Sequence, residues 1–218
     1  MLAQTLYLQW KWNRDFLAFF TVVAFVAPLI ILWIALTHVG VSSPRELVMV
    51  GGIIGVTAGV VAVLAGLTVA WHGYGIDERA GHTYALSLPM TRLRALGLRA
   101  GAAALLLALP AMGIWIGSML AAAKANLPPT LESYAGSLAL RGLLASWLAH
   151  ACMFGLRYAA GRRAKAVLAA LIILGGTLAF LSVAAPALHD PIVRLGRFLI
   201  DGPGPFGILA GRWTLIDV

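Results

Sequence analysis

The sequence predicts an all-α membrane protein, and three observations lead to this prediction. Of the 218 residues, 61% are hydrophobic and only 11% are charged, whereas about a quarter of the residues in a soluble domain are charged. The mean hydropathy is +0.91. The apolar residues are gathered in uncharged blocks of about 20 residues, the length that crosses a bilayer as a helix. We therefore expect residues 1–218 to form a single polytopic transmembrane domain, without a separate soluble catalytic domain.

Five apolar blocks, four of them uncharged, predict five transmembrane helices. They are residues 16–36, 47–70, 100–123, 134–158 and 166–188. The fourth block holds Arg141 near its start, and this long side chain is expected to reach back to the membrane interface. Residues 189–218 contain no block of spanning length, so we expect an extracytoplasmic or re-entrant tail there.

The first 15 residues predict a short helix that lies in the membrane interface. Leu2, Leu6 and Trp10 recur at every fourth position, so one face of this helix is apolar. A cleaved signal peptide has an apolar core of about 7–15 residues, which is shorter than the block 16–36. We therefore expect residues 1–15 to form an interfacial helix that leads into the first span.

The distribution of positive charges predicts the orientation. Ten of the 16 Lys and Arg residues lie before the first block, between the second and third, or in residues 157–165, where the fourth block ends and the connection to the fifth follows. Basic residues accumulate on the cytoplasmic side of a membrane, so the sequence predicts a multi-pass protein of the inner (plasma) membrane with a cytoplasmic amino terminus. The same bias accounts for the net charge of +8, and we expect no nucleic-acid partner.

The spans carry no familiar catalytic pattern. The sequence has no GxxxxGK[ST], HExxH or GxSxG motif, and its eight acidic residues all lie outside the blocks. A proton-coupled carrier is not expected, because it needs an ionisable group at membrane depth. His150 is the candidate polar residue inside a span. It is expected to be either a hydrogen-bonded residue in helix packing or a proton relay. The single cysteine, Cys152, forms no intramolecular disulfide and supports no Cys-based metal site.

Small residues at four-residue spacing predict where the helices pack. Without a hydrophobic driving force between helices in lipid, glycines let two backbones approach closely. The repeated glycines are Gly51, Gly55 and Gly59 in the second block and Gly113 and Gly117 in the third. Pro28 and Pro110 lie inside the first and third blocks, and each is expected to kink its helix.

The connection 71–99, between the second and third blocks, is the most informative segment. Asp77 and Glu78 are suited to the first turn of a helix, where the macrodipole favours negative charge. Together with Pro89 as a stop, they predict a short helix parallel to the membrane. Thr91 then predicts an N-cap for the helix that follows.

This segment resembles the coupling helix of the ABC-2 type permeases, the membrane subunits of one class of ATP-binding-cassette transporters. Members show an acidic-Glu-Arg-x-x-Gly-Thr-like step, then Leu-Ser-Leu-Pro-[Val/Met]-[Ser/Thr]-Arg. The matching residues are Glu78, Arg79, Gly81, Thr83 (displaced by His82), Leu86, Ser87, Leu88, Pro89, Met90, Thr91 and Arg92. The amphipathic amino-terminal helix, the amino-in topology and the tail segment 211–217 are also similar to the family.

The resemblance implies a function and partners. The chain would be a permease subunit that forms the translocation path and exports an amphipathic or lipid-like substrate, beside a second permease chain. ATP and Mg²⁺ would be held by a cytoplasmic ATPase subunit, so this chain itself would bind no cofactor and would not be an enzyme. The implied coupling residues are Asp77, Glu78, Arg79, Gly81, His82, Thr83, Leu86, Ser87, Leu88 and Pro89.

The number of spans is open at this point. The family usually has six spans, so either a sixth helix follows Val218 or this is a five-span variant. The alternative function is a non-transporting structural subunit of a larger membrane complex. In that case, changes in residues 77–92 would leave assembly with an ATPase untouched. A membrane-embedded enzyme that uses His72, His82 or His150 is less favoured, because no acidic residue lies at a suitable spacing from them.

Overall fold

The computed structural model describes residues 2–40, 43–79, 91–125, 135–160 and 163–170, and the single residues 173, 174, 177, 190 and 194. Among these residues 97% are helical and none is in a strand, which confirms the all-α prediction. Four helical stretches are long and apolar enough to cross a membrane: Leu2–His38, Met49–Gly75, Leu93–Ala125 and Ala135–Ala160. The predicted fifth span, 166–188, and the predicted tail, 189–218, lie largely outside the described residues.

The chain divides into two compact units. The first contains residues 1–153 and 212–218, and the second contains residues 154–211. The described part of the second unit is the carboxyl-terminal end of one long helix, up to Ala160, and the helical residues 164–170. The first unit holds the helix packing described below.

Helix α1 runs from Leu2 to Ile34 without interruption, whereas the sequence predicted an interfacial helix 1–15 and a separate span 16–36. The helix continues because no glycine occurs between Leu2 and Ile34, and the one proline, Pro28, does not end it. A π-helical turn, η1, follows at Ala35–Val39 and ends at Gly40, which has a left-handed backbone with φ of 67°. At 1.5 Å per residue, α1 is about 50 Å long, longer than the hydrocarbon core of a bilayer.

Helix α2 runs from Pro44 to Arg79, and a capping box opens it. The Ser43 backbone N–H donates to Glu46 Oε2 at 3.2 Å, and the Glu46 backbone N–H donates to Ser43 Oγ at 3.3 Å. Each side chain satisfies a donor that the helix leaves free, and proline is well suited to the first helical position. The far end of α2 lies nine residues beyond the predicted boundary at Ala70, and residues 71–79 contain no proline that would end the helix.

Ser43→Ala should lower the free energy of unfolding by about 1 kcal/mol, because the first turn of α2 loses its cap. Unfolding of the purified protein by denaturant in mixed micelles measures this change. Thr57→Ala is the control, since the Thr57 hydroxyl donates only to the Ile53 carbonyl of its own helix. Its expected effect is within about 0.5 kcal/mol. Equal losses in both variants would show that the cap is not the cause.

The third span is built from two helices, α4 at Arg92–Leu106 and α5 at Ala108–Ala125. Thr91 caps α4, with its side chain accepting from the Arg94 backbone N–H, and this confirms the predicted N-cap. The helix breaks at Leu107, three residues before Pro110. Proline has no N–H to donate to the Leu106 carbonyl and its ring crowds that carbonyl, so the predicted distortion at Pro110 is confirmed.

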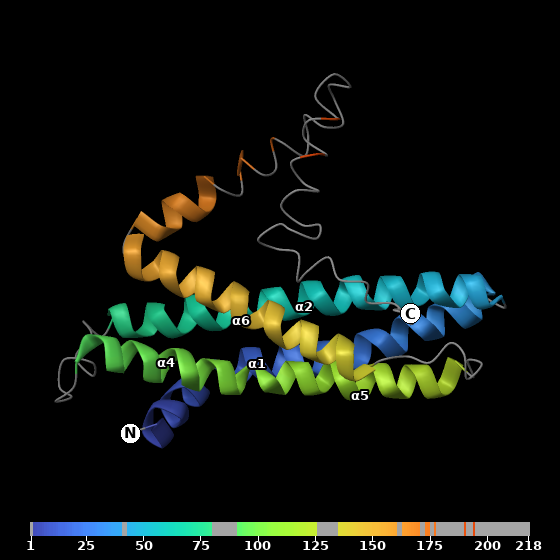
Figure 1. The fold of residues 1–218 in the computed structure, drawn as a ribbon, viewed down its shortest axis with the longest axis horizontal. Helices are drawn as coiled ribbons and strands as arrows, with labels where there is room; N and C mark the ends of the chain where they lie inside the picture. Colours follow the sequence, from blue (N-terminus) through green and yellow to red (C-terminus); the bar gives the residue numbers. More distant parts are fainter. Residues whose placement is uncertain are drawn as a thin grey trace. The chain divides into compact units, whose positions relative to one another are not determined.

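The fourth helix, α6, spans Ala135–Ala160. Figure 1 shows α1, α2 and the α4–α5 pair side by side, with successive helices running in opposite directions. An apolar core lies between the helices, and near its centre Leu17, Leu107 and Ile114 are fully buried. Its buried members are Leu17, Phe20, Ala24, Ala58, Val61, Ala62, Ala65, Val69, Ala103, Leu106, Leu107, Ile114 and Leu138.

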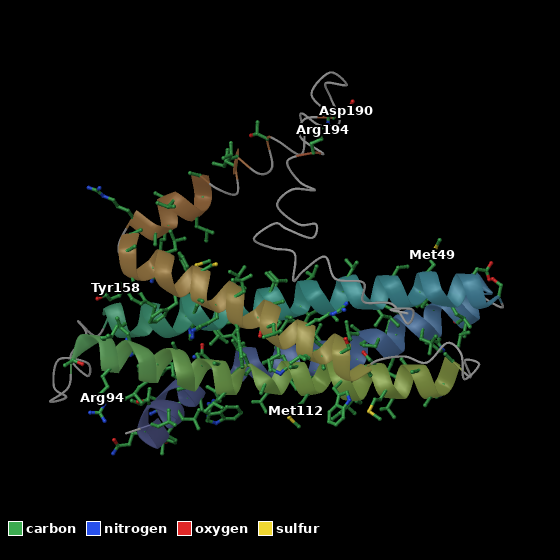
Figure 2. The ribbon with its side chains drawn as sticks, viewed as in Figure 1. Met49, Arg94, Met112, Tyr158, Asp190 and Arg194 are labelled. Carbon is green, nitrogen blue, oxygen red and sulfur yellow. The ribbon has the colours of Figure 1, made fainter. Side chains whose placement is uncertain are left out.

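The outward surface of the first unit is apolar. Met49 is 71% exposed and Met112 is 51% exposed, and Figure 2 shows both side chains pointing away from the helices. Large exposed apolar residues occur along α1, α2, α5 and α6, while polar residues such as Asn13 and Ser146 are buried. An apolar outer surface over a core that also buries a few polar side chains is the arrangement expected of a bundle solvated by lipid.

Candidate functional site

The predicted coupling residues lie only partly within the described structure. Asp77, Glu78 and Arg79 occupy the last turn of α2. The remaining predicted coupling residues fall outside the described residues; they are Gly81, His82, Thr83, Leu86, Ser87, Leu88 and Pro89. The sequence placed Asp77 and Glu78 in the first turn of a separate short helix, whereas the structure continues α2 through both positions.

This placement reverses the electrostatic argument for the two acids. The carboxyl-terminal end of a helix carries partial negative charge, so Asp77 and Glu78 oppose the macrodipole instead of complementing it. Each unfavourable charge at such a position costs about 0.3–1 kcal/mol. At these positions the dipole of α2 does not favour the two acids.

The ends of α2 and α4 that border this segment lie beside the start of α1. A Cβ atom placed on Gly73, near the end of α2, would lie 3.0 Å from Gln9 Oε1 and 3.5 Å from Asn13 Nδ2. Helix α4 begins after the Thr91 cap at the same end. Figure 2 shows Arg94 at this end, with its side chain directed away from the helices. The amino terminus of α1 and the 77–92 segment thus belong to the same end of the bundle.

An amide pair fills the contact between α1 and α2 at this end. Asn13 Nδ2 donates to the Gln9 carbonyl at 2.9 Å and to Gln9 Oε1 at 3.2 Å. Asn13 is fully buried, and its Oδ1 atom has no hydrogen-bond partner. Beside the pair, the Phe16 and His72 rings meet edge to face with centroids 4.9 Å apart. The amides pack directly on the backbone at Gly73, so α1 and the end of α2 are in close contact.

The predicted packing glycines differ in their surroundings. A Cβ on Gly113 would meet the Thr21 carbonyl at 2.7 Å, and one on Gly117 would overlap the Phe25 carbonyl, so α5 crosses α1 at these glycines. In α2, Gly55 is buried, while Gly51 and Gly59 are half-buried.

Two further glycines of α2 make close contacts that the four-residue search missed. A Cβ on Gly66 would overlap the Ser146 carbonyl of α6, and Gly73 packs on Gln9. Gly59, Gly66 and Gly73 recur at a spacing of seven residues, which keeps them on one helical face. That spacing is the signal that could have found them.

His150 lies where α6 meets α2. It is 6% exposed, and its backbone nitrogen would lie 3.1 Å from a Cβ placed on Gly66. One turn earlier, the Ser146 hydroxyl donates to the Leu143 carbonyl. Within the described ranges, no three His, Cys, Asp or Glu side chains gather where a metal ion could bind. The surroundings of His150 are those of a helix-packing position.

No family model, curated protein or solved structure matches this chain.

Proposed function

We propose that this chain is the permease subunit of an ATP-binding-cassette transporter of the ABC-2 type. It forms the translocation path with a second permease chain, either identical or similar, and exports an amphipathic or lipid-like substrate across the inner (plasma) membrane. A cytoplasmic ATPase subunit binds and hydrolyses ATP with Mg²⁺. The segment from Asp77 to Pro89 docks on that subunit and passes its motion to the spans.

The observation that carries this proposal is the motif of residues 78–92 between the second and third spans. Its placement supports a docking role, because the segment joins the ends of α2 and α4 at the end where α1 begins. Asp77 and Glu78 lie in the last turn of α2, so two acidic residues stand where the segment begins. The five apolar blocks contain no acidic residue, and in the four candidate spans the one acid is Asp15, near the start of the first. This composition suits an apolar or amphipathic substrate more than a cation.

Purification with an epitope tag in mild detergent tests this proposal. An ATP-binding-cassette ATPase should co-purify with the chain in a stoichiometric amount, identified by mass spectrometry. A variant in which Ser87, Leu88 and Pro89 are each replaced by glycine should lose that ATPase. A matched variant with Gly97, Gly101 and Gly155 replaced by alanine should keep it, because a Cβ at each of these positions meets nothing within 4 Å.

A structural subunit of another complex would give a different result. The chain would then co-purify with other membrane proteins and without an ATPase, and the glycine variant would leave that set unchanged. Such an outcome would overturn the permease proposal.

A further inference from the structure

The first half of α1 has two faces of opposite character. Thr5, Gln9 and Asn13 are buried, at 9%, 7% and 0% exposure. On other sides of the same turns, Tyr7 is 65% exposed and Trp10 is 41% exposed. The contact of Gln9 with Gly73 fixes the rotation of the helix about its axis, so the outward direction of the exposed residues follows from packing.

Four outward residues form a continuous stripe. Tyr7, Trp10, Lys11 and Arg14 stand at positions i, i+3, i+4 and i+7, which lie above one another on a helix. All four are exposed. We call these four residues the aromatic–basic stripe. Asp15 is a charged residue next to the stripe, and its side chain is 89% exposed. Its Oδ1 atom lies 3.4 Å from Arg14 Nε. An ion pair this exposed contributes little, so Arg14 retains its attraction for other anions.

The length of α1 places the stripe at the level of lipid headgroups. The helix is about 50 Å long, whereas a bilayer with its headgroups measures about 40–45 Å. Phe16 and Phe19 follow the stripe and are exposed, and Trp33 is exposed near the other end of the helix. If Phe16 to Trp33 lie in the hydrocarbon and its borders, the stripe falls just outside it. Tyr and Trp rings are favoured at that depth.

We propose that Tyr7, Trp10, Lys11 and Arg14 form a site for the headgroup of an anionic phospholipid. The two cations contact the phosphate, and the two rings, which lie one turn farther from Phe16, pack against the outer part of the headgroup. The order along the helix is two rings and then two cations, all on one stripe, while the opposite face of α1 contacts α2 at Gly73. This proposal depends on membrane insertion of α1 and not on the transport function.

The test uses the full chain, purified in mild detergent and mixed with equal amounts of phosphatidylglycerol and phosphatidylcholine. Native mass spectrometry measures the ratio of the two lipids retained. The unsubstituted chain should favour phosphatidylglycerol. Lys11→Gln with Arg14→Gln should reduce the preference by about fivefold for each cation removed. Trp10→Ala should lower the retention of both lipids.

A control with the same change in net charge is Arg94→Gln with Lys124→Gln, since both side chains are exposed and neither lies in the stripe. This control should keep the preference for phosphatidylglycerol. An excess of soluble glycerol phosphate should displace little of the bound lipid, because the acyl chains contribute to binding.

Three results would overturn the proposal. The first is an unchanged lipid ratio in the Lys11 and Arg14 double variant when that variant elutes as a single species. The second is an equal loss of phosphatidylglycerol preference in the control, which would show that the preference depends on net charge and not on a site. The third is displacement of the bound lipid by glycerol phosphate. Loss of a co-purifying protein with an unchanged lipid ratio would assign the stripe to an acidic protein surface instead.

Discussion

Gly117→Leu should lower the free energy of unfolding by about 2–3 kcal/mol. The space where a side chain would begin at Gly117 is filled by backbone atoms of Phe25 in α1. Backbone cannot move aside as the tip of a flexible side chain can, so α1 and α5 must separate. Because lipid supplies no hydrophobic force to hold the helices together, the lost close packing is not recovered elsewhere. Unfolding by sodium dodecyl sulfate, followed by tryptophan fluorescence, measures the change.

Gly101→Leu is the matched control for this substitution. Gly101 is a helical glycine of the same span, and a Cβ placed there meets nothing within 4 Å. The added side chain projects outward, and leucine has a higher helix propensity than glycine. The control should therefore unfold at the same detergent fraction as the original chain or a higher one. A comparable loss in both variants would contradict the packing of α1 against α5 at Gly117.

Glu78→Lys should uncouple the proposed transporter while leaving the spans folded. If the last turn of α2 leads into the segment that docks on the ATPase, reversing this charge weakens docking. We expect the stimulation of ATPase activity by the permease to fall about tenfold, equivalent to 1.4 kcal/mol. The helix itself should gain about 0.3–1 kcal/mol, because lysine complements the carboxyl-terminal end of the dipole.

Two measurements separate docking from folding in this variant. ATPase activity of the reconstituted complex reports coupling, and thermal unfolding of the permease alone reports the helix. Asp15→Lys is the control, because it makes the same charge change at the same end of the bundle and Asp15 is 89% exposed. It should keep full coupling. Normal coupling in Glu78→Lys, or a loss of permease stability, would contradict the docking role.

The helical class and four of the spans could be predicted because each depends on composition over many residues. A block of about 20 apolar residues must be helical in a membrane, since every backbone polar group needs a partner within the segment. Local signals also predicted the N-cap at Thr91 and the helix distortion at Pro110. A hydroxyl cap and a missing N–H act within one turn, so they need no information about neighbouring helices.

Helix ends and contacts between helices were harder to predict. The sequence placed a boundary after residue 15 and another at Ala70, but α1 and α2 continue through these positions. Charges near a membrane edge do not end a helix, because a helix satisfies its own backbone in water as well as in lipid. The contact of Gly66 with Ser146 depends on which face of α2 meets α6, and this is a tertiary property.

The break at Leu107 divides the third span into two helical segments, α4 and α5, with a gap in the hydrogen-bond ladder between them. A helix with an unbroken ladder of hydrogen bonds bends only as a stiff rod, whereas Pro110 removes one bond of that ladder. The α4 segment can therefore tilt with the end that bears Thr91 while α5 stays seated on α1 through Gly113 and Gly117. The break therefore sets the direction of α4 relative to α5 on one side of Leu107, while the contact of Gly113 and Gly117 with α1 lies on the other side.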